Sequence, residues 1–429
     1  MIAIMGSIVM PMILSTRIAI CQRAYNGAMI PIYLDYNATT PLDPSVVEAM
    51  LPYLQTHFGN PSSTHEYGKT AHDAVEHARA QVAALIGAET EEIVFTGGGT
   101  EASNQAIKGA VFARVSRGLL DAALSAFWMR SAKAHIVISA IEHPATANPC
   151  AFLRRLGCKI TVVPVDSHGM VDPDDVRKAM PATLVSIMHS NNEVGTLQPI
   201  REIEALCRER CRLFHTDAAQ SLGKLPVDVK KLNVDMLTIA GHKLYAPKGV
   251  GVLYVHKGVE LEPLIHGAGH EGGRRAGTEN VPYIVALGKA CEIARQSLPH
   301  ATSKLKRLRD RLWDKLRAGL GDKIMLNGHP ELHLPNTLNA NFIGHVGAEL
   351  LQKTPEIAAS TGSACHEGRI AQSSVLCAMS VPPEIGKGAV RLSVGRFTTE
   401  EEIDRAAEAL LKTIRLAYAP GETASSRGA

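Results

Sequence analysis

The chain has 429 residues, of which 45% are hydrophobic and 20% are charged, as in an ordinary folded globular protein. Because one domain typically has roughly 100–200 residues, this length predicts two packed domains. The net charge is +3, and no run of basic residues stands out, so the sequence gives no sign of a nucleic-acid partner or of stable association with a membrane. Small molecules and other proteins are the expected partners.

The eight cysteines are scattered and do not form a disulfide framework, which fits a reducing compartment. Residues 1–28 have no acidic residue, and Arg17 interrupts their apolar run, so a membrane anchor is not expected. Two interpretations of this leader remain: an upstream start that adds a non-functional segment, or a targeting segment. Cytoplasm is the favoured location, and the mitochondrion is the second candidate. Residues 419–429 are small and polar, and we expect a disordered tail.

Between residues 45 and 290, short β-branched runs alternate with amphipathic helical stretches. Helices are expected at 45–54 and 71–86. This alternation predicts a large α/β domain with a mostly parallel, seven-stranded sheet. Ligands in such domains lie at the carboxyl ends of the strands, so residues that follow strands are the first to examine for chemistry. The expected strands are residues 93–96, 135–139, 160–165, 184–189, 213–216, 236–239 and 250–255.

The pattern changes after residue 290. A charged helix is expected at 301–320, with strands at 338–342 and 390–394 and a last helix from Thr399. These elements predict a smaller α/β domain over residues 291–418, and we assign residues 29–44 to an N-terminal segment that joins it.

Three residue patterns follow expected strands. Lys243 lies in Gly241-His-Lys243, where its amine can be presented in a cleft to form a Schiff base. Asp217 ends the preceding strand, and a pyridinium nitrogen needs such a carboxylate to stay protonated. A strand also runs through Gly97-Gly-Gly99 into a helix, whose N-terminal N–H groups suit a phosphate. Together the three patterns indicate pyridoxal 5′-phosphate as the cofactor.

Two other patterns are interpreted as structural. Residues 267–272 spell a dinucleotide fingerprint, but they follow no convincing strand and open no helix. Cys207 and Cys211 lie four residues apart on an expected helix and could face a metal. No further ligand clusters nearby in the sequence, so we interpret them as buried thiols and expect no resident metal.

From about Ile32 to the last helix, the sequence resembles the group I cysteine desulfurases of the NifS/IscS type, which are fold-type I pyridoxal-phosphate enzymes. Many ordered blocks carry this resemblance. They are Tyr33-Leu-Asp-Tyr-Asn-Ala-Thr-Thr-Pro41, Phe58-Gly-Asn-Pro-Ser-Ser62, Glu142-His143, Asn191-Asn-Glu-Val-Gly195, Gly241-His-Lys-Leu-Tyr245, Arg275-Ala-Gly-Thr278 and Gly362-Ser-Ala-Cys365.

The resemblance implies roles around the cofactor ring. Lys243 is similar to the lysine that binds the cofactor covalently, and Asp217 to the partner of the ring nitrogen. Gln220 and Asn192 resemble the residues that form hydrogen bonds around the ring and its phenolic oxygen. His143 would stack over the ring and assist proton transfer, so it is expected both to bind the cofactor and to act in catalysis.

The resemblance also implies how phosphate and substrate are bound. Gly99, Thr100 and His242 would hold the phosphate, and Thr278 would reach it from a second subunit, which implies a homodimer with shared sites. Arg391 resembles the arginine that grips the substrate carboxylate, a task that suits the fork of a guanidinium better than an ammonium.

Cys365 resembles the loop cysteine that attacks the substrate sulfur. The implied reaction converts L-cysteine to L-alanine, with Lys243 as base, and leaves a persulfide on Cys365. The sulfur would pass to an acceptor such as an iron–sulfur scaffold protein, and Cys365 could contact a transferred cluster.

The chain departs from the family pattern at several positions. Ala240 stands in the phosphate site, where the family typically has a serine, and His366 follows the nucleophile, where small hydroxyl residues are common. Both features resemble the selenocysteine lyases, so selenocysteine is a second candidate substrate. The stretch 116–131 is longer than in compact bacterial members. The sequence is also compatible with an aminotransferase that does not need Cys365, or with a non-catalytic scaffold.

Overall fold

The structure is a computed structural model that describes residues 30–116, 134–361 and 372–418. The leader, most of the stretch 116–131, Cys365 with His366, and the tail therefore lie outside the described residues. No helix in the described ranges is long and apolar enough to cross a membrane.

Seven strands form the large sheet, in the order β2-β8-β7-β6-β5-β3-β4. Strand β8 runs antiparallel to both of its neighbours, and the other pairs are parallel. The bounds of these strands are β2 Ile93–Thr96, β3 His135–Ser139, β4 Lys159–Val163, β5 Ala182–Ser186, β6 Cys211–Asp217, β7 Met236–Ala240 and β8 Gly251–Val255. The predicted α/β fold with a mostly parallel seven-stranded sheet is confirmed, and every predicted strand is present within a few residues of its expected bounds.

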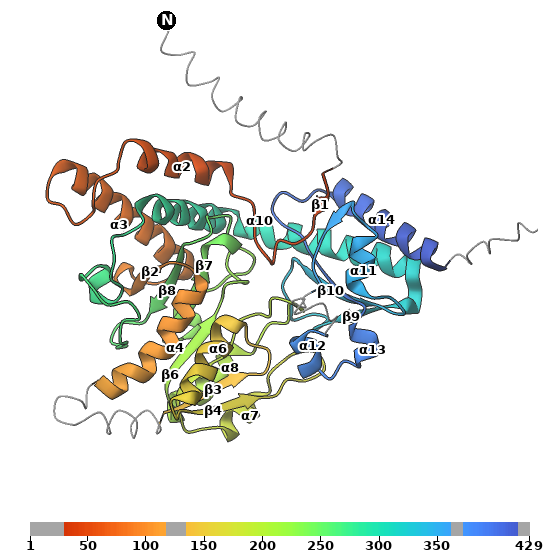
Figure 1. Cartoon of the computed structure of the whole chain (residues 1–429), viewed down its shortest axis with the longest axis horizontal. Coiled ribbons are helices and arrows are strands. Elements are labelled where there is room, and N and C mark those ends of the chain that lie inside the picture. Colours follow the sequence, from red (N-terminus) through yellow and green to blue (C-terminus); the bar gives the residue numbers. More distant parts are fainter. Residues whose placement is uncertain (1–29, 117–133, 362–371, 419–429) are drawn as a thin grey trace, which may run out of the picture.

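Helices cover both faces of this sheet (Figure 1). Successive residues of β3 point to opposite faces of the sheet. Ile136 and Ile138 pack with α4 and α6 on one face, whereas Val137 packs with the helices on the other face. This alternation follows from the pleat of a strand, and it explains why both sides of β3 are apolar. The helices of the large sheet are α2 Pro44–Gln55, α3 Glu66–Ile86, α4 Gly99–Ser116, α6 Pro144–Arg155, α7 Pro173–Lys178, α8 Ile200–Arg210 and α9 Val229–Leu232.

A second core surrounds a three-stranded antiparallel sheet of order β12-β10-β9. Ile32 and Leu34 from the N-terminal segment are part of this core, and β1 pairs with β11. The elements are β1 Ile32–Tyr33, β9 Ile324–Asn327, β10 Thr337–Phe342, β11 Ile357–Ala358, β12 Ala389–Ser393, α11 Gly347–Gln352, α12 Ser374–Ala378, α13 Pro383–Gly386 and α14 Glu400–Tyr418.

One helix, α10, runs over Val281–Leu320 and contributes to both cores (Figure 1). The sequence predicted a helix only from residue 301, and the proposed domain boundary at 290/291 falls inside this continuous helix. The first half was missed because residues 281–294 are mostly apolar and buried, with few charged positions to mark an amphipathic helix. Gly288 allows that close approach, since a Cβ there would lie 2.6 Å from the Cα of Ala78.

Candidate active site

A cavity of about 420 Å³ lies at the carboxyl ends of the parallel strands, between the two sheets. Most of the predicted site residues line it, although they come from distant parts of the chain. Those that line it are Gly99, Thr100, His143, Asn192, Asp217, Gln220, Ala240, His242, Lys243 and Arg391. Asn37, Ala38, Ala145, Met188, Ser190 and Ala219 complete the wall, and the sequence had assigned no role to them.

Asp217 is the last residue of β6, and its carboxylate is buried in the cavity wall. It accepts a hydrogen bond of 2.9 Å from the backbone N–H of Ala219. Burial raises its pKa, and the hydrogen bond from Ala219 and the interactions with His143 and Lys243 only partly oppose this effect. Within the described residues, no cation lies within ion-pair distance of this carboxylate, so the cavity offers an acidic partner for a bound N–H group.

Lys243 ends the single 3₁₀ turn Gly241–Lys243 that follows β7, and its side chain points to the N-terminal segment. Its Nζ donates hydrogen bonds to the carbonyl oxygens of Asn37, at 2.5 Å, and Ala38, at 2.6 Å. Burial lowers the pKa of this amine to about 8, and the positive charge of Arg391 adds to the effect. A nucleophilic amine is therefore available near neutral pH.

Helix α4 begins at Gly99, so the free N–H groups of its first turn are directed to the cavity end where Gly99 and Thr100 lie. Ala240 at the end of β7 lies against this turn: a Cβ on Gly99 would be 3.1 Å from the Cβ of Ala240. Ala240 has no hydroxyl group, so it cannot supply the side-chain hydrogen bond that a serine would give. His242 also lines the cavity, and burial lowers its pKa to about 4.

His143 is the N-cap of α6. Its Nδ1 accepts a hydrogen bond of 3.1 Å from the backbone N–H of Ala145. Burial and the charge of Lys243 lower the pKa of the imidazole, while Asp217 opposes them. Since Nδ1 is an acceptor, the proton of the neutral ring lies on Nε2, and His143 can donate that proton to a ligand.

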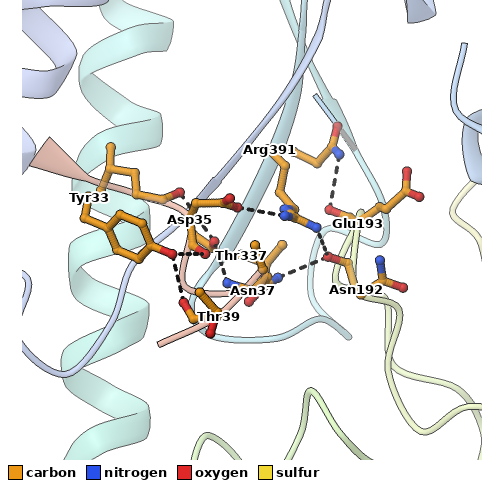
Figure 2. A network of polar contacts seen from close by, with 12 residues as sticks. Tyr33, Asp35, Asn37, Thr39, Asn192, Glu193, Thr337 and Arg391 are labelled. Carbon is orange, nitrogen blue, oxygen red and sulfur yellow. Dashed lines mark hydrogen bonds and ion pairs between the residues drawn. The ribbon is translucent and has the colours of Figure 1, made fainter. Parts of the chain in front are cut away.

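Arg391 on β12 lies between Asp35 and Asn192 (Figure 2). Its Nη2 forms an ion pair of 2.7 Å with Asp35 Oδ1, and its Nη1 donates to the carbonyl oxygen of Asn192 at 3.0 Å. The Nε atom is buried and has no partner in the described structure. Arg391 lines the cavity, and Nη1 and Nη2 each carry a second N–H group, which suits a carboxylate ligand.

Asn37 connects the walls of the cavity, and the sequence had given it no role. Its carbonyl oxygen accepts from Lys243 and from Gln220 Nε2, the latter at 3.0 Å. Its side chain donates to the carbonyl oxygen of Asn192 at 3.2 Å, and its Oδ1 accepts from the buried amine of Lys224 at 3.2 Å. Because a lone asparagine has no periodic signal, only the resemblance block at residues 33–41 pointed to this segment.

One predicted site residue does not line this cavity, and the place of another is not described. Thr278 is exposed in the loop before α10 and does not line it. Cys365 lies outside the described residues. The described residues also include no group of three or more His, Cys, Asp or Glu side chains arranged to hold a metal ion.

The donor set fits pyridoxal 5′-phosphate. A buried carboxylate without a cation partner, an amine of lowered pKa and a helix N-terminus are the groups that a protonated pyridine, an aldehyde and a phosphate require. Asp217, Lys243 and Gly99 bring these groups to one cavity.

Comparison with known proteins agrees with this geometry. A family model for class-V aminotransferases matches residues 32–406. The chain is 46% identical over 388 residues to a cysteine desulfurase IscS of Methanosarcina thermophila, and the match covers 90% of this chain and 92% of that relative. The chain belongs to the class-V aminotransferase family, among its cysteine desulfurases. This family of enzymes depends on pyridoxal phosphate, so the cofactor prediction is confirmed.

Solved structures support the same assignment. A NifS-like protein has a TM-score of 0.80 and 35% identity, and the match covers 90% of this chain and 100% of that one. The protein SspA, solved in complex with cysteine, has a TM-score of 0.73 and 35% identity, and the match covers 86% of this chain and 99% of that one.

Proposed function

We propose that this chain converts L-cysteine to L-alanine and transfers the sulfur as a persulfide on Cys365. The observation that carries the proposal is a single cavity that contains the Lys243 amine, the Asp217 carboxylate and the Arg391 guanidinium. The relatives are named cysteine desulfurases, and the similar protein SspA was solved with cysteine, which favours sulfur over selenium.

When bound, pyridoxal phosphate supplies an aldehyde for the substrate amine and a ring that accepts the electrons of the Cα–H bond. Asp217 would keep the ring nitrogen protonated. Arg391 would bind the substrate carboxylate, and Lys243, freed from its resting contacts, would take the proton from Cα. His143 would donate from Nε2. The roles of Asn192, Gln220, Gly99, Thr100 and His242 in holding the ring and the phosphate belong to the same proposal.

Sulfur transfer needs a thiolate, which we assign to Cys365. Its sulfur forms a bond to the substrate sulfur while the substrate C–S bond breaks. The electron pair of the broken bond stays with the carbon framework, which takes up protons and leaves as alanine. The persulfide would then pass its outer sulfur to an acceptor protein such as an iron–sulfur scaffold.

We further propose a homodimer in the cytoplasm, in which Thr278 completes the phosphate site of the second subunit. An exposed pair of aromatic side chains supports an interface between two chains. Phe58 and Tyr67 stack with centroids 5.6 Å apart, and both are exposed, at 75% and 60%. Glu271, seven residues before Thr278, forms a buried ion pair of 2.8 Å with Arg79, so the loop before α10 is anchored to α3.

The test measures alanine and sulfide release from L-cysteine in the presence of a thiol reductant. The Cys365→Ser variant should lose sulfide release, while Cys377→Ser, which changes an exposed cysteine on α12, should keep it. Equal activity of the two variants would remove Cys365 from the mechanism. Faster turnover of L-selenocysteine, with little turnover of L-cysteine, would favour a selenocysteine lyase.

A further inference from the structure

Asp35 is a charged residue at the site that the proposed reaction does not use. It lies in the N-terminal segment and forms a parallel bridge with Ser393, two residues beyond Arg391 on β12. Its carbonyl oxygen accepts from the backbone N–H of Ala38 at 2.9 Å and from the hydroxyl of Tyr33 at 3.2 Å. These contacts fix the backbone of Asp35, so its carboxylate is presented from a rigid position.

The carboxylate of Asp35 holds one side of the Arg391 guanidinium. It binds Nη2 at 2.7 Å, and the carbonyl oxygen of Asn192 binds Nη1 at 3.0 Å (Figure 2). The Asn192 carbonyl is itself held by the side chain of Asn37. The Asp35 carboxylate and the Asn192 carbonyl therefore hold Arg391 at two nitrogen atoms. Its third nitrogen, Nε, is buried and unpaired in the described structure.

This arrangement orders a long side chain before a ligand arrives. A free arginine side chain samples many rotamers. If the ligand itself must fix the side chain in one of them, the lost entropy lowers the affinity for the ligand. The side chain of Arg391 is only 7% exposed and that of Asp35 20%, so water screens their ion pair weakly. Asp35 also balances charge at the reacting amine, since its charge opposes the effect of Arg391 on Lys243.

We propose that Asp35 is a positioning residue for the substrate carboxylate: it holds the guanidinium of Arg391, which lines the cavity, in one orientation before the ligand arrives. The inference rests on the proposed function, in which Arg391 binds that carboxylate. Asp35 contacts Arg391 directly, and it would affect the substrate only through Arg391.

Two substitutions separate orientation from charge. Asp35→Asn keeps an acceptor oxygen for Nη2 but loses the charge, whereas Asp35→Ala loses both. For L-cysteine, Asp35→Ala should raise KM by roughly 10-fold or more, because one charge-assisted hydrogen bond is lost. Its kcat should change by less than about 3-fold, and Asp35→Asn should keep KM within about 3-fold of the parent. Asp73→Asn, at an exposed position on α3, is the control.

A second measurement needs no turnover. In the cofactor-free chain, the pH dependence of competitive acetylation of Lys243 reports its pKa. Both Asp35 variants should lower this pKa, since both remove the negative charge. The titratable or charged groups that interact with Lys243 in the described structure are Asp35, Asp217, Arg391, His143, His242 and Lys224.

The kinetic measurement and the acetylation measurement can each contradict a different part of the argument. A parental KM in Asp35→Ala, or an equal rise in KM in both variants, would overturn the positioning role. A parallel fall in kcat, cofactor content and thermal stability, with unchanged KM, would also overturn it by indicating a structural role. If the parent chain does not turn over cysteine, the proposed function fails and the positioning role fails with it. An unchanged Lys243 titration in both variants refutes only the effect of the Asp35 charge on this amine.

Discussion

The lowered pKa of Lys243 predicts a pH-dependent stability difference that substitution can reveal. The pKa falls from 10.5 to about 8 on folding. Below pH 8 the folded chain therefore holds a buried cation at a cost, and this cost disappears as the pH rises from 8 to 10.5. By linkage the cost is about 3 kcal/mol at pH 7 and about 1.5 kcal/mol at pH 9.5. Lys243→Met removes the titrating group and therefore the pH dependence.

Urea unfolding of the cofactor-free chain at the two pH values measures this effect. The stability of the parent relative to Lys243→Met should rise by up to about 2 kcal/mol between pH 7 and pH 9.5. The comparison between pH values removes any constant cost of the two lost hydrogen bonds to Asn37 and Ala38. Lys248→Met, at an exposed lysine nearby, should show no such change. A constant difference between parent and Lys243→Met would refute the argument that burial shifts this amine.

Three further substitutions test other parts of the site and fold. Arg391→Lys should raise KM for L-cysteine by roughly 10- to 100-fold, because an ammonium cannot replace the planar fork; a parental KM in steady-state kinetics would contradict this. Asp217→Asn should retain the cofactor, followed by absorbance, but lower kcat by roughly 10- to 100-fold, and an unchanged kcat would contradict the ring-nitrogen role. Arg79→Met should destabilise the chain by about 3–5 kcal/mol in urea unfolding, because it leaves the Glu271 carboxylate buried; Glu271→Gln in the same chain should recover part of the loss.

The sequence predicted the large sheet and the residues at its strand ends because local patterns specify them. The strand 135–139 is apolar on both sides since both of its faces are covered. Lys243 and Asp217 follow adjacent parallel strands, so they had to reach the same edge of the sheet. The resemblance supplied the remaining roles at Arg391 and His143, which strand patterns alone do not indicate.

The roles of Asp35, Asn37 and Lys224 could not be predicted in the same way. Their contacts join residues that are far apart in the chain, such as Asp35 with Arg391 and Asn37 with Lys224. A single asparagine or aspartate in a loop has no period that marks it as buried or exposed. Their environment exists only after the N-terminal segment packs between the two sheets.

These long-range contacts explain why the cavity is suited to a charged ligand. Lys224 is buried without a carboxylate within ion-pair distance in the described chain, and its two hydrogen bonds go to the amide oxygens of Asn37 and Gln220. Burial lowers its pKa well below the ordinary value. Asp217 also lacks a partner of opposite charge, because its buried carboxylate contacts no cation among the described residues. Lys224 lies behind the cavity wall and does not line the cavity, whereas Asp217 does. A ligand with a cationic ring nitrogen would offset the unfavourable charge of Asp217, and its binding energy would then stabilise the fold.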